Sequence, residues 1–310
     1  MPQTVDIEGH EIEVDNIGKV FFPEAGLTKK DLIDYYIEIS KYILPHLKDR
    51  PITMKRFPDG IKKDGFYQKE VPDYFPDWVE RIEIKEKENG IQKQVMVNKL
   101  ATLVYLADQA CIGPHTWLSR KNNLNKPDKM IFDLDPSTDE FIPVRDCAFD
   151  LNDLLKELDI NCYVMTTGST DIHVVVPLKP ERSFEEVKDF CDNVADILSE
   201  RFPEKYTTEK RKEKRNDRVF LDTARNSYGQ TSVSPYAVRA KDGAPVATPL
   251  YWEELDDSEI RSNRYTIKNI FRRLGQIEDP WKRYGEKSSA LGALTKKLRE
   301  SFDKISNYPQ

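Results

Sequence analysis

The chain has 310 residues, of which 38% are hydrophobic and 33% are charged, with a formal net charge of −6. This composition is typical of a globular protein with a strongly charged surface, and no apolar stretch approaches the roughly 18 residues of a membrane-spanning helix. The N-terminus lacks the basic and apolar segments of a signal peptide. We therefore expect no membrane partner and a cytoplasmic location.

The spacing of hydrophobic residues predicts three secondary-structure elements in the first part of the chain. Residues 28–48 form an amphipathic helix that Thr28 can cap, residues 81–88 alternate like a strand with one solvated face, and residues 102–111 form a compact apolar helix. Pro143 suits the first turn of a later helix. Further strands are expected at 130–135, 161–167, 172–178, 218–222 and 231–238, and further helices at 143–158, 183–202 and 266–274.

The order from residue 128 to residue 238 is strand, helix, hairpin, helix and strands, which indicates an α+β fold rather than a regular βαβ winding. The tail from about residue 276 is polar, and we expect it to be peripheral. We predict a single domain over residues 1–310, with a packed N-terminal α/β module at 1–125, a catalytic module with a metal site at 126–255, and a C-terminal helical segment and tail at 256–310.

The charge is unevenly distributed along the chain. The net acidity argues weakly against a nucleic-acid partner, but residues 205–218 (KYTTEKRKEKRNDR) hold seven Lys or Arg against three Asp or Glu.

The four cysteines form no CxxC pair and lie in apolar patterns, so we expect buried free thiols rather than a zinc site or disulfides. They are Cys111, Cys147, Cys162 and Cys191.

Two aspartates end the apolar strand of the segment IFDLDP. Asp133 and Asp135 are two residues apart, so on a strand they point to the same face. Like charges this close are tolerable when a cation lies between them, and carboxylate oxygens suit Mg²⁺ or Mn²⁺. The alternative is a solvated strand end in which the two aspartates carry no ion.

Asp222 ends a second apolar strand, RVFLD, and is either a third metal ligand or a strand-terminal turn residue. Between these strands, Gly168 and Ser169 form a tight turn suited to phosphate oxygens, and His173 follows at the start of a β-branched run. Arg239 suits a triphosphate because its guanidinium matches phosphate geometry, although a surface ion pair would explain it as well.

These residues lie within a larger set of sequence blocks that follow one another in a fixed order. Through these blocks the chain resembles the archaeo-eukaryotic primase superfamily, and within that superfamily the polymerase domain of bacterial end-joining ligase D. The resemblance runs from about residue 10 to residue 275. The blocks are GKVFFPEAGLTKKDLIDYY (18–36), ITMKRFPDG (52–60), GFYQKE (65–70), ACIGPHTW (110–117), IFDLDP (131–136), TTGSTDIHVVVPL (166–178), RVFLDTARN (218–226) and TSVSPYAVRAKDGAPVATPLYWEEL (231–255).

The resemblance implies a primase-polymerase-like core of mainly antiparallel sheet flanked by helices, and it implies roles for individual residues. Asp133, Asp135 and Asp222 would hold two catalytic Mn²⁺ or Mg²⁺ ions. The remaining roles are nucleotide binding for Lys55, His115, Ser169, His173 and Arg239, binding of a DNA 5′-phosphate for Lys19 and Lys29, and template stacking for Phe66 and Tyr67.

The implied function is a template-directed DNA repair polymerase of non-homologous end joining. It would add NTPs or dNTPs, with a preference for ribonucleotides, to primer 3′ ends at gaps, overhangs and breaks that carry a downstream 5′-phosphate. Since the polymerase would occupy the whole chain, separate Ku and DNA ligase partners are expected, and the location would be cytoplasmic and nucleoid-associated.

One departure from the family pattern lies in the hairpin, where Thr170 and Asp171 stand in place of the usual Lys-Gly. This removes a cation from the expected triphosphate site. Three other functions remain open: a replicative-type primase, a HAD-like phosphohydrolase with Asp133 as nucleophile, and a non-catalytic module that binds DNA ends. The absence of a cysteine cluster and the presence of the 5′-phosphate lysines favour the repair polymerase over the primase.

Overall fold

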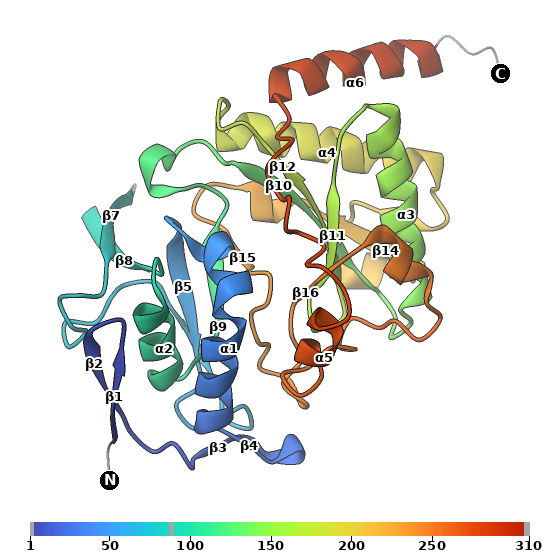
Figure 1. Ribbon diagram of the computed structural model, residues 1–310. Coiled ribbons are helices and arrows are strands. Elements are labelled where there is room, and N and C mark those ends of the chain that lie inside the picture. Colours follow the sequence, from blue (N-terminus) through green and yellow to red (C-terminus); the bar gives the residue numbers. More distant parts are fainter. Residues whose placement is uncertain (1–2, 87–89, 307–310) are drawn as a thin grey trace.

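Two six-stranded sheets form the centre of the computed structural model, which describes residues 3–86 and 90–306 (Figure 1). Every strand pairing in the first sheet is antiparallel, and its strand order is β15-β9-β5-β8-β7, with β6 added to β5. Its strands are β5 (Pro51–Arg56), β6 (Phe66–Gln68), β7 (Arg81–Glu86), β8 (Gly90–Met96), β9 (Cys111–Trp117) and β15 (Thr231–Val233).

The second sheet has the order β13-β14-β10-β12-β11-β16 and is antiparallel except for the parallel pair of β13 and β14. The predicted hairpin is confirmed, because β11 pairs directly with β12. The strands are β10 (Lys129–Asp135), β11 (Tyr163–Thr166), β12 (Ile172–Pro177), β13 (Tyr206–Thr207), β14 (Val219–Asp222) and β16 (Thr248–Leu250). The predicted α+β class with a mainly antiparallel core is therefore confirmed.

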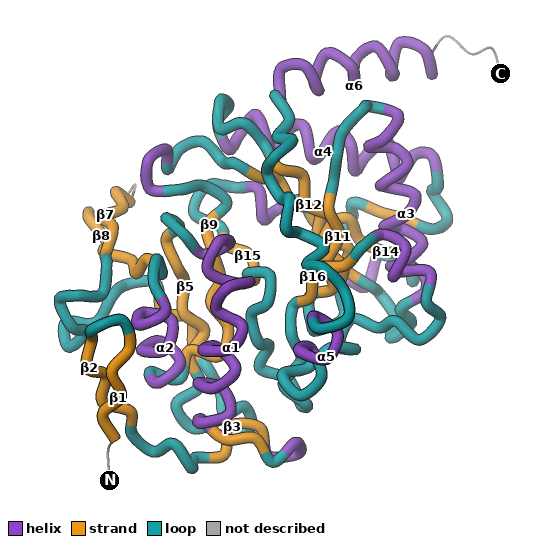
Figure 2. The backbone as a smooth tube through the Cα atoms, in the orientation of Figure 1, coloured by secondary structure: helices purple, strands orange, loops and turns teal. Residues whose placement is uncertain are grey.

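Helices flank these two sheets, and Figure 2 shows the helices in purple and the strands in orange. The helices are α1 (Lys29–Leu47), α2 (Leu100–Asp108), α3 (Ile142–Glu157), α4 (Phe184–Arg201), α5 (Ile270–Leu274) and α6 (Leu291–Ser306). Short 3₁₀ helices span Pro23–Ala25, Lys121–Asn123, Lys212–Lys214, Ala224–Asn226 and Trp252–Asp256, and two small hairpins pair β1 (Gln3–Ile7) with β2 (His10–Val14) and β3 (Val20–Phe22) with β4 (Leu27–Thr28).

The described residues form two hydrophobic cores, one around each six-stranded sheet. We call the parts of the molecule around the first and the second sheet its two halves. The first includes Leu32 and Ile39 of α1 and Ile52 of β5, and the second includes Phe132 of β10 and Val194 of α4, all fully buried. Each of the two long helices begins with a reciprocal capping box, which satisfies backbone donors at the first turn. The caps are Thr28 with Asp31 for α1, as the sequence predicts for Thr28, and Ser183 with Glu186 for α4.

The chain crosses between the halves after β14. The 3₁₀ helix Ala224–Asn226 follows β14 of the second sheet, and β15 then pairs with β9 of the first sheet. Asn226 fixes this crossing, because its side chain bonds both backbone groups of Ile131 at 2.7 and 2.9 Å. We call residues 223–230 the crossing segment.

Several predicted boundaries are wrong, and local backbone geometry explains most of them. The helix expected at 102–111 ends at Asp108, because Ala110 has φ +60° and Cys111 already begins β9. The strand expected at 231–238 ends at Val233, where Pro235 and the left-handed Tyr236 (φ +65°) turn the chain. The helix expected at 266–274 begins only at Ile270.

The tail is less peripheral than expected. Trp281 is only 4% exposed, its ring stacks on that of Tyr284 with 5.0 Å between the centroids, and it donates a hydrogen bond to the carbonyl oxygen of Val164 of β11 at 3.2 Å.

All four cysteines are buried and free, as predicted. The strand expected at 81–88 is present to residue 86, and residues 87–88 lie outside the described residues. Among the described helices, none has the length and apolarity needed to cross a bilayer.

Candidate active site

Three aspartates share one face of the second sheet. Asp133 lies on β10 directly opposite Asp222 of β14 on one side and His173 of β12 on the other. Side chains opposite one another in antiparallel strands project to the same face, as do residues two apart on one strand. Asp133, Asp135, Asp222 and His173 therefore form a single row of polar side chains across this sheet.

Asp133 is the most enclosed of the three, with 5% of its surface exposed. Arg225 Nε lies 3.3 Å from its Oδ2, and His173 Nε2 lies 3.3 Å from its Oδ1. Burial raises the pKa of Asp133, but His173 and Arg225 outweigh burial, so the pKa lies below its ordinary value. Oδ1 has no well-aligned hydrogen-bond donor among the described residues, so this buried oxygen has capacity for a ligand.

The other two aspartates bond to the protein itself. Asp135 accepts a hydrogen bond from Arg215 at 2.7 Å, and Asp222 accepts one from the backbone N–H of Ala224 at 2.7 Å. Within residues 3–86 and 90–306, no three His, Cys, Asp or Glu side chains converge closely enough to hold an ion. The donor set has the right chemistry for Mg²⁺ or Mn²⁺. Arg215 contacts Oδ2 of Asp135, so an ion bound at that oxygen would compete with the arginine.

A cavity of about 310 Å³ opens beside this row, between the two sheets. Of the residues predicted from the sequence, it brings together Tyr67, His115, Asp133, His173 and Arg239. Lys55, Ser169, Asp135 and Asp222 are not among its lining residues. The cavity thus gathers three of the five nucleotide-binding candidates, His115, His173 and Arg239, around one of the three aspartates.

His115 enters the cavity from β9 and is 9% exposed. Burial, with a smaller effect of Arg239, lowers the pKa of His115 to about 3, so the ring is neutral at physiological pH. Its Nδ1 lies 3.2 Å from the carbonyl oxygen of Gly113, and the ring of Tyr67 packs edge-on at 5.7 Å. Because a carbonyl oxygen can only accept, the neutral ring donates from Nδ1 to Gly113, which leaves Nε2 as an uncharged acceptor.

Arg239 packs against the hairpin turn between β11 and β12. It donates to the carbonyl oxygen of Thr167 at 2.8 Å. Gly168 has φ +72°, and a Cβ at this position would lie 2.9 Å from Arg239 Cγ, so only glycine allows this approach. Burial lowers the pKa of Arg239 from a very high ordinary value. Ser169 is half-buried next to this turn.

The exposed aromatic residues lie on the edge strand β6. Phe66 is 46% exposed and Tyr67 is 60% exposed. The register places them opposite Arg56 and Lys55 of β5, and Lys55 Nζ lies 5.0 Å from the Tyr67 ring centroid. Each exposed ring thus has a cation beside it, and Tyr67 with Lys55 offers such a pair next to the cavity, which Tyr67 lines.

The two lysines predicted to bind a 5′-phosphate lie together at the two ends of the β3–β4 hairpin, outside the cavity lining: Lys19 precedes β3, and Lys29 is the first residue of α1. The backbone N–H of Lys29 donates to the carbonyl oxygen of Lys19 at 2.8 Å. Both side chains already have carboxylate partners. Lys19 pairs with Asp59 at 2.7 Å at the surface, whereas the buried Lys29 pairs with Asp15 at 2.8 Å and with Asp108 at 2.6 Å.

Several charged residues of the site were not predicted as site residues from the sequence. Arg225 follows Asp222 by three residues in the block RVFLDTARN, and Arg215 belongs to the basic segment 205–218. Asp171, already conspicuous as a departure from the family pattern, lines the cavity; burial and the charge of Asp133 raise its pKa. Lys69 lines the cavity too. Only the tertiary structure brings these charges together.

Comparison with known proteins places this chain in a family. Residues 28–281 match the family described as LigD, primase-polymerase domain. The chain is 32% identical over 266 residues to the bifunctional non-homologous end joining protein LigD of Bacillus subtilis, covering 85% of this chain and 42% of that protein. It is 31% identical over 271 residues to the multifunctional LigD of Mycolicibacterium smegmatis, covering 86% of this chain and 35% of that protein.

Among solved structures, the polymerase domain from Mycobacterium tuberculosis ligase D in complex with DNA is similar, with a TM-score of 0.83 and 26% identity. The match covers 90% of this chain and 99% of that chain. By contrast, this chain spans about two fifths of the length of the curated relatives. The chain belongs to the LigD primase-polymerase domain family, whose members are nucleotidyltransferases of the polymerase class.

Proposed function

We propose that this protein is a template-directed repair polymerase of non-homologous end joining. It adds nucleotides, with a preference for ribonucleotides, to primer 3′ ends at gaps and breaks that carry a downstream 5′-phosphate. The observation that carries this proposal is the register that sets Asp133 between Asp222 and His173, beside a cavity that also holds Arg239. The similarity to a polymerase domain solved with DNA supports the choice of substrate.

Asp133, Asp135 and Asp222 would hold two divalent ions, Mn²⁺ or Mg²⁺. When bound, such ions neutralise phosphate charge and lower the pKa of the attacking 3′-hydroxyl. The protein contributes the orientation: Asn226 ties the crossing segment to β10, which sets Arg225 against Asp133. Arg215 and Arg225 would neutralise the charges of Asp135 and Asp133 as long as no ion is bound to these carboxylates.

The incoming NTP or dNTP would lie in the cavity of about 310 Å³. Arg239 and His173 would contact its phosphates, with Lys55 and Ser169 at the edge and neutral His115 as an uncharged hydrogen-bonding group. Asp171 opposes this arrangement, since its carboxylate lines the same cavity.

The DNA would bind on the first sheet. Phe66 and Tyr67 would stack template bases, and Lys19 and Lys29 would bind the 5′-phosphate of the downstream strand. Separate Ku and DNA ligase proteins would complete end joining, in association with the nucleoid. We further propose that residues 1–310 work as one domain, because β15 and the crossing segment tie the 126–255 portion to the 1–125 portion.

The proposal is tested by primer extension on a one-nucleotide gap, with and without the 5′-phosphate. NTPs or dNTPs are supplied with Mn²⁺ or Mg²⁺, and Asp133→Asn serves as the inactive control. Templated addition that the 5′-phosphate stimulates supports a gap-filling repair polymerase. Synthesis that needs no primer would indicate a replicative-type primase instead, and a phosphoenzyme on Asp133 without extension would indicate a phosphohydrolase.

A further inference from the structure

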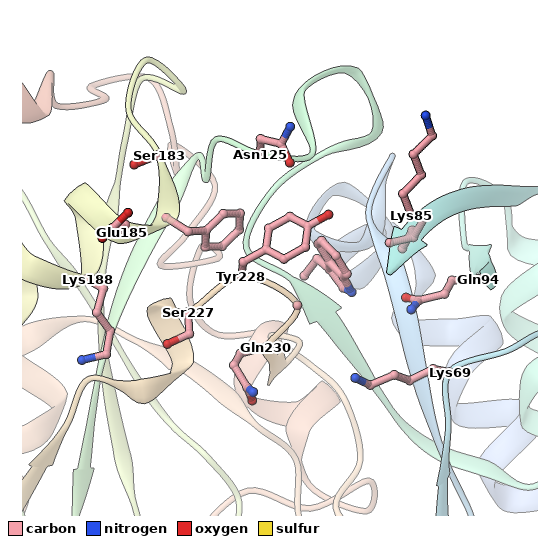
Figure 3. A pocket seen from close by; sticks show the side chains of 14 residues that line it. Lys69, Lys85, Gln94, Asn125, Ser183, Glu185, Lys188, Ser227, Tyr228 and Gln230 are labelled. Atoms are coloured by element: carbon pink, nitrogen blue, oxygen red, sulfur yellow. The ribbon is translucent and has the colours of Figure 1, made fainter. Parts of the chain in front are cut away.

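A second cavity, of about 980 Å³, adjoins the candidate active site. Lys69, Gly229 and Gln230 line both cavities, so the two lie side by side. Figure 3 shows Tyr228 of the crossing segment between two walls, with Lys69, Lys85 and Gln94 on one side and Ser227 and Lys188 on the other. A strand with its end in the active site can therefore extend into this second cavity.

Two deeply buried side chains on this cavity have unsatisfied polar atoms. Trp117 is 2% exposed and Gln94 is 1% exposed, and both line the cavity. Neither Trp117 Nε1 nor Gln94 Oε1 has a hydrogen-bond partner among the described residues. An unmet buried donor or acceptor is costly, so such atoms are normally paired. One free donor and one free acceptor in one cavity match the edge of a nucleobase, which carries both kinds of group.

An aromatic ring is held in place beside these atoms. Tyr228 is 42% exposed, yet two buried rings fix it edge to face. Trp117 packs against it at 5.1 Å and 83°, and Phe184 at 5.6 Å and 88°. A fixed and accessible aromatic ring is the platform on which unpaired bases stack in proteins that bind single strands.

The charge of the cavity suits phosphates. Its lining contains three lysines, Lys69, Lys85 and Lys188, against one acidic residue, Glu185. Lys188 pairs with Asp192 at 2.6 Å, whereas the exposed Lys69 and Lys85 form no ion pair with any described residue. Two unpaired cations on one wall favour the sugar-phosphate backbone of a nucleic acid strand.

We propose that this cavity binds an unpaired nucleotide of a DNA strand whose end lies in the active site. The base stacks on Tyr228 and bonds Trp117 Nε1 and Gln94 Oε1, while neighbouring phosphates lie along Lys69 and Lys85. The inference rests on the proposed function, because the strand is the substrate of the polymerase. It adds a site that holds the unpaired part of an imperfect DNA end next to the point of synthesis.

The test measures binding without catalysis. A fluorescently labelled single-stranded oligodeoxynucleotide of about six nucleotides, a length within the site sizes known for single strands, is titrated by anisotropy into the full chain carrying Asp133→Asn. Tyr228→Ala is expected to weaken binding about tenfold, because stacking on an aromatic ring is lost. Tyr228→Phe keeps the ring and is expected to retain affinity. Thermal unfolding of each variant reports whether it is folded.

Two further variants remove the unpartnered polar atoms. Trp117→Phe loses the donor and is expected to weaken binding about threefold to tenfold, since Trp117 Nε1 has no partner in the described residues to lose. Gln94→Met loses the acceptor and is expected to have an effect of the same size; it also loses the hydrogen bond that Gln94 Nε2 donates to Gln92 at 2.6 Å, so its thermal unfolding is compared with that of the parent. Tyr251→Ala is the matched control. Tyr251 is a similarly exposed tyrosine, at 39%, which lines neither cavity, and its variant is expected to bind as the parent does.

Three outcomes would overturn the inference. Equal affinity of Tyr228→Ala and the parent would show that the strand does not stack on Tyr228. Loss of affinity in Tyr251→Ala as large as in Tyr228→Ala would show nonspecific binding. A free mononucleotide that binds with the same dependence on Tyr228, while the oligonucleotide does not, would assign the cavity to a small ligand. If extension fails but the Tyr228 dependence holds, the proposed polymerase function fails while the binding site stands.

Discussion

The carboxylate row and the start of α1 both carry charges that the sequence assigns to ligands, and both satisfy those charges internally in different ways. In the row, Asp133 and Asp135 pair with Arg225 and Arg215 beside a cavity, and Asp135 remains 41% exposed. At the start of α1, the Lys29 side chain is 5% exposed and its partner Asp108 is 4% exposed. The first arrangement can exchange a protein cation for a ligand, whereas the second is part of the packed interior.

This comparison shows that the type of a residue does not establish its role. A buried ion pair is costly to break, because the remaining charge is left without a partner, while a pair at an open cavity can be replaced by solvent or ligand. Lys29 therefore has a structural task in addition to any phosphate contact.

Asp133→Asn removes a charge at the centre of the row while it preserves the volume of the side chain. We expect templated primer extension to fall by about 10³-fold, the scale of losing one preorganised electrostatic group. The exposed Asp139, close to the end of β10, provides the control Asp139→Asn, which is expected to keep full activity. Extension rates at saturating nucleotide measure the effect; equal rates for the two variants would remove Asp133 from catalysis.

Lys29→Met leaves Asp108 buried without its closest cation. We expect the free energy of unfolding to fall by about 3 kcal/mol, as for other broken buried pairs. The neighbouring variant Lys30→Met breaks only an exposed pair with Asp34 and is expected to unfold like the parent. Urea denaturation of both proteins measures the difference. The contrast between the two regions fails if Lys29→Met is as stable as Lys30→Met.

Asp171→Asn removes a carboxylate from the nucleotide cavity. Because its charge repels a triphosphate, we expect KM for the nucleotide to fall about fivefold, equivalent to about 1 kcal/mol, with little change in kcat. Steady-state kinetics on the gapped substrate separate the two constants. An increase in KM would mean instead that Asp171 itself helps to bind the nucleotide.

Arg215→Gln releases Asp135 from its ion pair. We expect the affinity for Mn²⁺ to rise about threefold, in line with the modest energies of partly exposed pairs. Calorimetric titration with Mn²⁺ measures this affinity directly, without turnover. Arg211→Gln changes an exposed arginine of the same basic segment and serves as the control. Weaker binding of Mn²⁺ by Arg215→Gln would show that Arg215 supports the ion site.

Lys19→Ala affects an exposed cation whose partner, Asp59, is exposed as well. We expect stability to be unchanged, and the salt dependence of binding to a 5′-phosphorylated gap to lose a slope of about 0.9, the value for one phosphate contact. Binding at several salt concentrations provides the slope. Gaps without the 5′-phosphate are the control, and an unchanged slope on the phosphorylated gap would exclude the contact.

The sequence by itself determined much of the local structure. The apolar periodicity predicts α1, α3, α4, β10 and the β11–β12 hairpin, and Thr28 marks the start of α1. These elements depend on contacts between residues close in sequence, such as caps and alternating side chains, so a local pattern contains the information. The strand alternation also predicts that Asp133 and Asp135 share a face.

Only the tertiary structure decided which charges meet. Arg215, Arg225 and Asp171 are distant from Asp133 in sequence, and the pairing of β10 with β12 and β14 brings their segments to it. The same is true of Lys29 and Asp108, and of the cavity around Tyr228. Burial and ion pairing are properties of long-range contacts, and for this reason the sequence predicts the types of residue at the site but not their partners.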